Sequence, residues 1–289
     1  MMKSSTSTTK DGVLMGVVVT ATAVGVGIGM VAGSFLQKYL PVHNHRGTFW
    51  RRRRLASRPS YKPGQTPSLP WPTFGQKIHV FDPSQLKSAY NLIISAITPR
   101  PIALVSSRHP ITGIDNVAPF SYFGCVGHDP PMIVIGFCRS RNGAMKDSIT
   151  NILASNEFSV QIISEWYLDA ANHSCGAFAP NVDEYQESGM TKASCEIIQS
   201  PRVKEAGISM ECQVVHVHPM KNPQSGNLTT EIVLAQIVKI HVDETLLVPN
   251  FDPLNPVVDT TKLQPLGRLG GNLYTTLGEI VDIPRPQVS

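Results

Sequence analysis

The stretch IDNVAPFSYF, residues 114–123, is an apolar and aromatic run with three residues that a central strand usually avoids. Asn116 and Ser121 place polar groups where packing is expected, and Pro119 removes a hydrogen-bond donor from the ladder. These polar groups stand beside aromatic side chains such as Tyr122. A flat heteroaromatic ring needs both apolar surface and hydrogen bonds at its edge. We therefore predict that this backbone lies along a flat ligand as well as pairing with its neighbours.

The segment CRSRNGAMKDSITNIL, residues 138–153, follows soon afterwards. It gathers cations and small polar residues around a predicted helix start: Arg139, Arg141, Lys146, Asp147 and Ser148. Helix N-termini with nearby cations bind phosphate groups. A ring site followed by a phosphate site favours a mononucleotide such as a flavin. The alternative is that the aromatic residues belong to the core and the cations to a solvated turn.

The arrangement of strand-like and helix-like runs predicts the fold class. Runs rich in branched and aromatic residues predict strands at 102–107, 117–123, 132–137, 158–163, 211–218 and 230–242. Helices are predicted at 146–155 with Asp147 as N-cap, at 164–175 starting near Ser164 or Glu165, and at 182–189 ending at Gly189. Because strands and helices do not alternate regularly, a doubly wound parallel sheet is disfavoured. We predict a mainly β fold, an antiparallel barrel with inserted helices.

The positive charge of the chain is concentrated at its N-terminus. Residues 1–70 contain ten Lys and Arg against Asp11 alone, whereas residues 71–289 contain fifteen Lys and Arg against twenty Asp and Glu. Such a split favours a basic arm near a membrane or polyanion over a nucleic-acid-binding domain. The five cysteines include no C-x-x-C pair, which predicts free thiols in a reducing compartment rather than a disulfide framework or a zinc site.

Residues 13–36 form an uncharged run that is long enough to span a bilayer, which takes about 20 residues. Glycines at 25, 29 and 33 repeat with the G-x-x-x-G spacing of packed membrane helices. We predict a tail (1–12), a single transmembrane anchor (13–36), a basic, Pro-rich linker (37–75) and a folded domain (76–289). A cleaved signal or transit peptide and a flexible Gly-rich tail are the alternatives. The arginines at 51–54 place the domain in the cytosol or the mitochondrial matrix.

Motifs along the domain, in order, resemble the flavin reductase-like, FMN-binding split-barrel family. They are AITPRPIALVSSRHPITGIDNVAPFSYFGCVGHDPPMIVIGF (96–137), KDSITNILASNEFSVQII (146–163), GAFAPNVDEYQESGM (176–190), SPRVKEAGISMECQVVHV (200–217) and GRLGGNLYTTLGE (267–279). The resemblance covers approximately residues 76–282. It implies a six-stranded antiparallel split β-barrel, usually a homodimer with FMN at or near the subunit interface.

The resemblance also implies which residues contact FMN. Beside the isoalloxazine ring it places Ser106, Ser107, Arg108, Asn116, Ala118 and Ser121. The KDS..NI motif, where the family usually has KDT..NI, places Lys146, Asp147, Ser148 and Asn151 around the phosphate. Gly124 stands where the family often has Asn, so this chain lacks a side-chain amide that the family can use for a flavin or structural contact. Arg268 and Tyr274 are expected at the flavin face or the substrate pocket, with dimer packing as the alternative.

The function implied is that of an FMN-binding oxidoreductase, an NADH- or NADPH-dependent flavin reductase. Hydride transfer requires alignment of nicotinamide with flavin and no protein nucleophile, so no catalytic acid or base is assigned. One alternative is a tightly bound FMN electron carrier or an oxygenase-like flavoprotein with another acceptor. A second alternative is a membrane-tethered binding module without turnover.

Overall fold

The computed structural model describes residues 53–54, 64, 66–67, 75–140, 142–283 and 285–286. The predicted tail, the membrane anchor at 13–36, most of the linker and Arg141 lie outside the described residues. Those predictions are therefore untested by the structure. Among the residues that are described, no helix combines the length and the apolar character needed to cross a membrane.

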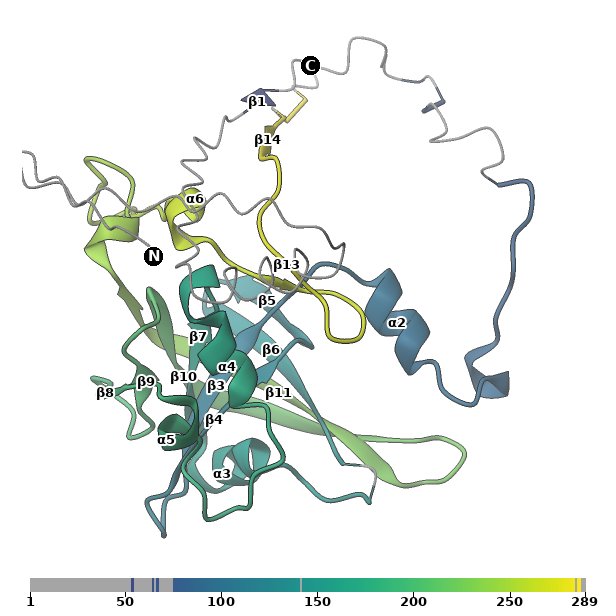
Figure 1. Cartoon of the computed structure of the whole chain (residues 1–289), viewed down its shortest axis with the longest axis horizontal. Helices are drawn as coiled ribbons and strands as arrows, with labels where there is room; N and C mark the ends of the chain where they lie inside the picture. Colours follow the sequence, from purple (N-terminus) through teal and green to yellow (C-terminus); the bar gives the residue numbers. More distant parts are fainter. Residues whose placement is uncertain are drawn as a thin grey trace, which may run out of the picture. The chain divides into compact units, whose positions relative to one another are not determined.

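An antiparallel sheet forms the body of the domain. In the described part of the chain its seven strands pair in the order β4-β3-β7-β10-β11-β6-β5 (Figure 1), and each pair is antiparallel. The strands are β3 (Ala103–Arg108), β4 (Asp115–Phe120), β5 (Phe123–His128), β6 (Pro131–Cys138), β7 (Glu157–Ile162), β10 (Ile208–Lys221) and β11 (Leu228–Val242). The mainly β, antiparallel prediction is confirmed.

The predicted strand over 117–123 is wrong in one respect, and the error explains how the sheet closes. β4 ends at Phe120, β5 begins at Phe123, and these are the two edge strands of the sheet. Ser121 and Tyr122 carry the chain from one edge to the other, while the N–H of Gly136 in β6 donates to the Tyr122 carbonyl at 2.8 Å. The sheet therefore curls into a split barrel with one strand more than the six expected.

Pro119 fits this arrangement because β4 is an edge strand. Within the described chain β4 pairs only with β3, and Pro119 lies opposite Leu104. A proline is tolerated at an edge, where the missing N–H interrupts no second ladder. The unusual composition of the 114–123 run thus has a structural cause as well as the predicted functional one.

β3 is buried on both faces, which separates two apolar clusters. Ala103 and Val105 point into the barrel and pack with Phe120 and Phe137. Leu104 points outward into a second cluster under the helices that cover this side of the sheet. Such a strand reads as a continuous apolar run because neither face meets water.

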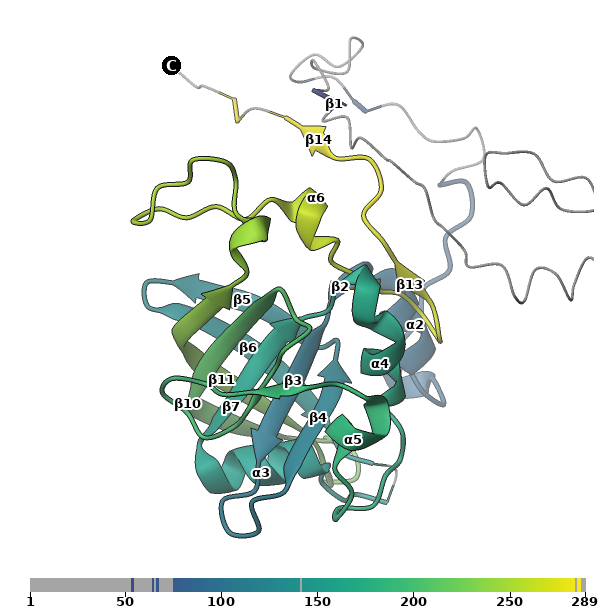
Figure 2. The ribbon, with the colours of Figure 1, turned by 60° about the vertical axis from the view of Figure 1, so that its left-hand side comes forward.

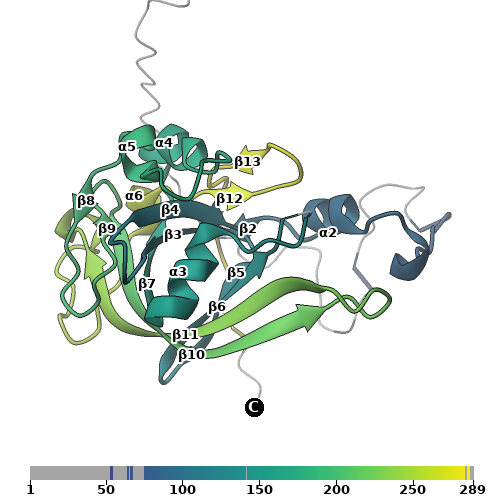
Figure 3. The same ribbon diagram turned by 90° about the horizontal axis from the view of Figure 1, so that it is seen from below.

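The helix α3 (Asp147–Ser155) covers one end of the barrel (Figure 3). Its Ile149 and Ile152 are fully buried members of the barrel cluster. The predicted N-cap is wrong by one residue, because Lys146 occupies that position and makes no side-chain capping bond. Asp147 is instead the first helical residue. The helix ends at Ser155 and is followed by the C-cap residue Asn156, whose φ of 59° is left-handed.

A helical layer covers the outer face of β3 and β4 (Figure 2). It consists of η2 (Glu165–Tyr167), α4 (Leu168–His173) and α5 (Glu184–Ser188). The helix predicted over 164–175 thus begins as a 3-10 turn with Ser164 as N-cap. The predicted end of the third helix is confirmed, since Gly189 terminates α5 with a φ of 72°.

The remaining described elements are short. They are β1 (Arg53–Arg54), η1 (Pro83–Gln85), α2 (Tyr90–Ala96), β2 (Arg100–Pro101), β8 (Lys192–Ala193), β9 (Arg202–Val203), η3 (Glu244–Leu246), α6 (Thr260–Leu263), β12 (Gly267–Arg268), β13 (Tyr274–Thr275) and β14 (Val281–Asp282). β2, β12 and β13 form a small sheet of their own, and β1 pairs in parallel with β14. The five cysteines, all in the described part, are free.

Candidate functional site

Four of the predicted FMN contacts meet in a buried polar cluster where α3 covers the barrel. Ser107 of β3 lies opposite Asn116 of β4. From α3, the Ser148 hydroxyl donates to Asn116 Oδ1 at 2.5 Å and Asn151 Nδ2 donates to Ser107 Oγ at 3.2 Å. All four side chains are buried. The cluster therefore ties the start of α3 to the two strands that the sequence nominated for flavin binding.

Glu184 of α5 joins this cluster from the other side, and sequence analysis missed it. Asn116 Nδ2 donates to Glu184 Oε1 at 2.6 Å. The Glu184 side chain is only 5% exposed, and its Oε2 atom has no partner in hydrogen-bonding geometry. Burial raises the pKa of Glu184, opposed by hydrogen bonding to its carboxylate, including the Asn116 amide. A half-satisfied buried acceptor of this kind is rare in folded proteins.

A cavity of about 360 Å³ adjoins the cluster; we call it the Glu184 cavity. Its polar walls include His109, Asn116, Asp147, Thr150, Asn151 and Glu184. Three of these, Asn116, Asp147 and Asn151, are predicted FMN contacts. No Lys or Arg is among the described residues that line it. Burial also raises the pKa of Asp147. Asp147 and Glu184 therefore place two carboxyl groups at a cavity whose described lining includes no Lys or Arg.

Lys146, the N-cap residue of α3, does not line the cavity but directly precedes its wall residue Asp147. Lys146 is exposed and its Nζ lies 5.4 Å from the centroid of the Phe120 ring. Among described residues it makes no ion pair within 4.0 Å. Ala118, two residues before Phe120 on the same face of β4, is half-buried against the barrel cluster. The Lys146 ammonium therefore lies over the ring of Phe120, which is itself a buried core residue.

Ser106 and Arg108 are turned away from this cluster. Because side chains alternate along a strand, Ser106 and Ser107 point to opposite faces of β3. Ser106 accepts a hydrogen bond from the Tyr185 hydroxyl at 2.8 Å. Arg108 pairs with Asp115 through Nε at 2.7 Å. Burial of Asp115 opposes its ionisation. The ion pairs with Arg108 and Lys192 nevertheless keep the pKa of Asp115 below its usual range.

Arg139 is also engaged within the chain. Its Nε donates to Glu231 at 2.8 Å and its Nη1 donates to the Gly143 carbonyl at 3.1 Å. The side chain lines an open cavity of about 830 Å³ between the turn after β6 and the β10–β11 hairpin. Within the described structure, the predicted role of Arg139 in phosphate binding would therefore compete with an ion pair already formed.

Ser121, Arg268 and Tyr274 belong to a separate region organised by a buried arginine that sequence analysis missed. Arg100 Nε donates to Ser121 Oγ at 3.3 Å, and Nη2 donates to the Leu269 carbonyl at 2.9 Å. Its Nη1 donates to two carbonyls at the end of α2, each at 2.6 Å. The signal for Arg100 in the sequence was its position between two prolines, directly before the strand predicted at 102–107.

The last motif packs on itself and on α4. The Arg268 guanidinium lies 4.3 Å from the centroid of the Tyr274 ring, and the Tyr274 hydroxyl donates to Asn172 Oδ1 at 2.8 Å. Tyr122, which is exposed, lies next to Ser121 at the corner between the edge strands. No contact in hydrogen-bonding distance joins these residues to the Glu184 cavity in the described chain.

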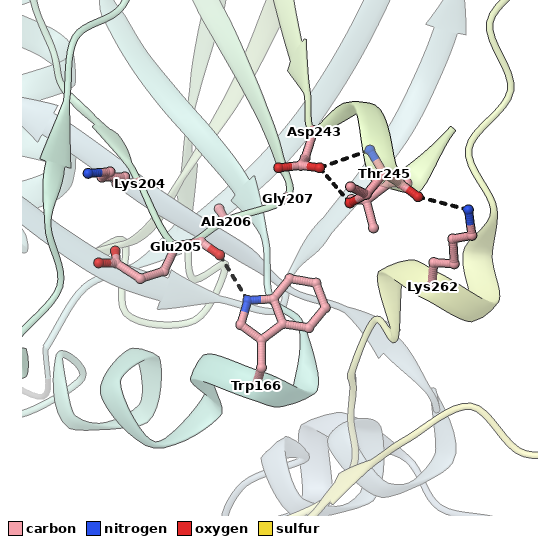
Figure 4. Close-up of a pocket in the computed structure, with 9 residues that line it drawn as sticks. Trp166, Lys204, Glu205, Ala206, Gly207, Asp243, Thr245 and Lys262 are labelled. Atoms are coloured by element: carbon pink, nitrogen blue, oxygen red, sulfur yellow. Dashed lines mark hydrogen bonds between the residues drawn. The ribbon is translucent and has the colours of Figure 1, made fainter. Parts of the chain in front are cut away.

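A third cavity, of about 660 Å³, lies elsewhere on the domain (Figure 4). We call it the Trp166 cavity, and its walls include Trp166, Gly207, Asp243, Thr245, Leu246 and Lys262. Its polar groups are bonded to one another or to nearby backbone: Asp243 accepts from the Thr245 N–H at 2.9 Å, and Lys262 donates to the Thr245 carbonyl at 2.9 Å. None of the predicted FMN contacts lines it.

Comparisons with known proteins show the family to which the domain is similar. The flavin reductase like domain family matches residues 95–256. A protein of Halalkalibacterium halodurans is 32% identical over 203 residues, which are 70% of this chain and 93% of that protein. YwrF of Bacillus subtilis is 30% identical over 72% of this chain and 100% of its own length.

Solved structures show the same fold. Nitrilotriacetate monooxygenase component B of Bacillus cereus is 31% identical with a TM-score of 0.66, over 72% of this chain and 99% of that one. The 2-nitrobenzoate 2-nitroreductase of Pseudomonas fluorescens is 28% identical with a TM-score of 0.60, over 73% and 96%. A split-barrel protein of Shewanella frigidimarina at 17% identity and a TM-score of 0.59 supports the fold alone.

Proposed function

The chain belongs to the flavin reductase like domain family, and from this premise we propose that it binds FMN between β4 and the start of α3. We propose further that it uses NADH or NADPH to reduce flavin. The observation that carries the proposal is the buried cluster of Ser107, Asn116, Ser148 and Asn151. It brings together residues from two distant motifs beside a cavity.

The residues present fit the cofactor. Glu184 and Asn116 offer hydrogen-bonding groups inside the cavity, one of them an orphaned acceptor. The half-buried Ala118 on β4 offers apolar surface for a ring. The exposed Lys146 at a helix start offers a cation for a phosphate. Bound FMN supplies the capacity to take a hydride from a nicotinamide and pass electrons to an acceptor.

The role of the protein in this proposal is binding and alignment. Asn116 is held on both sides, by Ser148 and Glu184, so its amide has one orientation. A fixed amide positions a ligand more strictly than a freely rotating one, and such alignment accounts for much of the rate in reactions of bound partners. No side chain is assigned as acid or base.

A second candidate function is direct reduction of a small aromatic acceptor by FMN that stays bound. The similarity to the 2-nitrobenzoate 2-nitroreductase, which spans 96% of that protein, favours it. The two candidates differ in whether FMN is retained through purification. A flavin spectrum from the purified protein without added FMN supports the second, and turnover of added FMN supports the first.

The test is a titration of the purified protein with FMN, followed by anaerobic addition of NADH or NADPH. We expect saturable binding and bleaching of the flavin absorbance. In the variant Lys146→Ala, loss of a phosphate contact worth about 1.5–3 kcal/mol should weaken FMN at least tenfold. Lys204→Ala, an exposed lysine at the Trp166 cavity, is the control. Equal affinity in all variants would contradict the placement of the phosphate.

We also propose that the protein is a homodimer attached to a membrane through residues 13–36, with its domain in the cytosol or mitochondrial matrix. The support is the sequence pattern and the family resemblance. Sedimentation of the purified protein would show the dimer. Recovery of the full chain in the membrane fraction, and of a chain lacking residues 1–36 in the soluble fraction, would show the attachment.

A further inference from the structure

We infer that Arg268 binds the carboxylate of a small organic acid on the sheet formed by β2, β12 and β13. The site lies apart from the cavity proposed for FMN, and the binding step needs no flavin. Use of the bound acid as an electron acceptor rests on the second candidate function above, whereas the binding itself does not. Three features of this sheet support the inference: the register of two arginines, the lack of carboxylates around them, and an unused donor.

Two arginines lie directly opposite each other where β2 and β12 run side by side (Figure 3). Arg100 of β2 is the antiparallel partner of Arg268 of β12. Directly opposite side chains leave a sheet on the same face, and like charges in such a pair are destabilising. The pair therefore calls for a negative group that offsets the repulsion.

No described carboxylate supplies that negative group. Within the described part of the chain, neither arginine has an Asp or Glu oxygen within 4.0 Å. The partners of Arg100 are all neutral, namely the Ser121 hydroxyl and three backbone carbonyls. Two of these carbonyls belong to the end of α2, where a helix favours a cation. They offset part of the charge of Arg100 and leave that of Arg268 uncompensated.

Arg268 also has an unused donor. Its Nη2 donates to the Gly271 carbonyl at 2.7 Å, whereas its Nη1 is buried without a hydrogen-bond partner. An unsatisfied charged donor costs free energy that an acceptor from a ligand recovers. The residue as a whole is only half-buried, so a ligand can approach the guanidinium from solvent.

The surroundings of Arg268 favour an organic carboxylate as that ligand. A guanidinium offers parallel N–H groups that match the two oxygens of a carboxylate. The Tyr274 ring, whose centroid is 4.3 Å from Arg268 Cζ, supports the guanidinium and is itself held by its hydrogen bond to Asn172. Leu273 is 64% exposed and precedes Tyr274 in the chain, so it offers apolar surface for the remainder of the acid.

Burial raises the pKa of Tyr274, and the positive charge of Arg268 opposes that rise. No Asp or Glu contributes to the shift. The tyrosine that touches the guanidinium thus meets a positive charge without a neighbouring carboxylate. This agrees with a site whose negative group comes from a ligand.

The experiment measures the binding of benzoate, and of its neutral analogue benzamide, to the purified full-length protein by saturation-transfer NMR without added flavin. We expect benzoate to bind at least tenfold more tightly, because benzamide lacks the charge-assisted hydrogen bonds. Arg268→Gln should weaken benzoate at least tenfold and leave benzamide unchanged. Arg268→Lys keeps the charge but loses the paired N–H groups, so it should weaken benzoate about threefold.

Arg202→Gln is the matched control. Arg202 is also half-buried, donates to one backbone carbonyl, that of Ser194 at 3.1 Å, and forms no ion pair within the described chain. The residue opposite Arg202 is Ala193 rather than a second arginine. Its substitution should leave benzoate affinity unchanged. Equal losses in Arg202→Gln and Arg268→Gln would reveal a general effect of net charge and overturn the assignment.

Three other results would overturn the inference. One is benzoate binding no tighter than benzamide in the wild type, and another is wild-type benzoate affinity in both Arg268 variants. The third is displacement of benzoate by inorganic phosphate at an equal or lower concentration, which would reveal a phosphate site. If circular dichroism shows Arg268→Gln to be unfolded, Arg268→Lys decides. Because no flavin is added, a failure of FMN to bind in the earlier titration overturns the proposed function and leaves this inference standing.

Discussion

Glu184 and Glu211 are both buried glutamates, yet their surroundings differ in the number of donors they supply. Glu211 lies in β10 and is fully buried. Its carboxylate accepts from the consecutive backbone N–H groups of residues 196–198, at 2.7, 2.7 and 3.1 Å, and it contacts His241 Nε2 at 2.6 Å. Burial alone would favour the neutral acid, but these donors lower the pKa of Glu211 to about 2.

Glu184 has one side-chain donor, the Asn116 amide, and one oxygen with no partner in hydrogen-bonding geometry. Burial is then the stronger influence, and the pKa moves upward. Both side chains are buried, yet the pKa shifts are opposite, because more donors stabilise the ionised form of Glu211 while the Asp147 carboxyl adds to the upward shift of Glu184. A satisfied carboxylate such as Glu211 holds a loop in place. The carboxylate of Glu184 is held through one oxygen, and the other is buried without a hydrogen-bond partner.

The largest expected effect is the loss of stability in Glu211→Gln. The amide group of Gln turns a donor toward backbone donors that the carboxylate satisfied, which should lower the free energy of unfolding by about 2–4 kcal/mol. Urea unfolding measures it, with Glu187→Gln as the exposed control. A Glu211→Gln variant as stable as the wild type would contradict the structural role assigned to Glu211.

Acid titration sharpens the same contrast. The folded-state pKa of Glu211, about 2, lies below its ordinary value of 4.5. Its contribution to stability is therefore complete above pH 4.5 and is lost as the pH falls from there toward 2. Urea midpoints measured across this window should fall less steeply in Glu211→Gln than in the wild type. Parallel pH profiles of the two proteins would contradict the assignment.

An intermediate effect is expected for His241→Ala. This change removes one donor to Glu211 and leaves the three backbone N–H groups, so stability should fall by about 1 kcal/mol. The loss should be smaller in a Glu211→Gln background, because the partner is already altered. A double-mutant cycle by urea unfolding measures the coupling. Additive losses would show that the 2.6 Å contact contributes nothing.

The smallest effect on stability is expected for Glu184→Gln. Because the folded-state pKa is raised, ionised Glu184 costs stability as the pH rises above its ordinary value of 4.5. A neutral Gln removes that cost, so unfolding at pH 8 should be unchanged or harder by up to about 1 kcal/mol. The difference should shrink on acidification. A marked destabilisation at pH 8 would place Glu184 in the same class as Glu211.

The sequence was sufficient for most of the fold, because runs of branched and aromatic residues mark strands wherever they lie. It was insufficient at Ser121 and Tyr122, where the chain passes from one edge strand to the other. The residues on both sides are alike, so no change of pattern marks the break. Because adjacent residues of a strand face opposite sides of the sheet, the sequence could have predicted that Ser106 and Ser107 do not lie in the same cluster.

The site was predicted in part for a similar reason. Asn116, Ser148 and Asn151 are recognisable from their motifs, and the structure brings them together. Glu184 lies 68 residues from Asn116 in the chain. A glutamate on a short helix normally faces solvent, and no local pattern shows which distant amide it will meet. Only the packing of α5 against β4 reveals it.

A crystal structure of the protein grown with FMN would test the central claim most directly. Our account predicts the flavin between β4 and the start of α3, with its phosphate within reach of Lys146. FMN found in the Trp166 cavity, or a Glu184 cavity that stays without flavin while FMN is bound elsewhere, would contradict it.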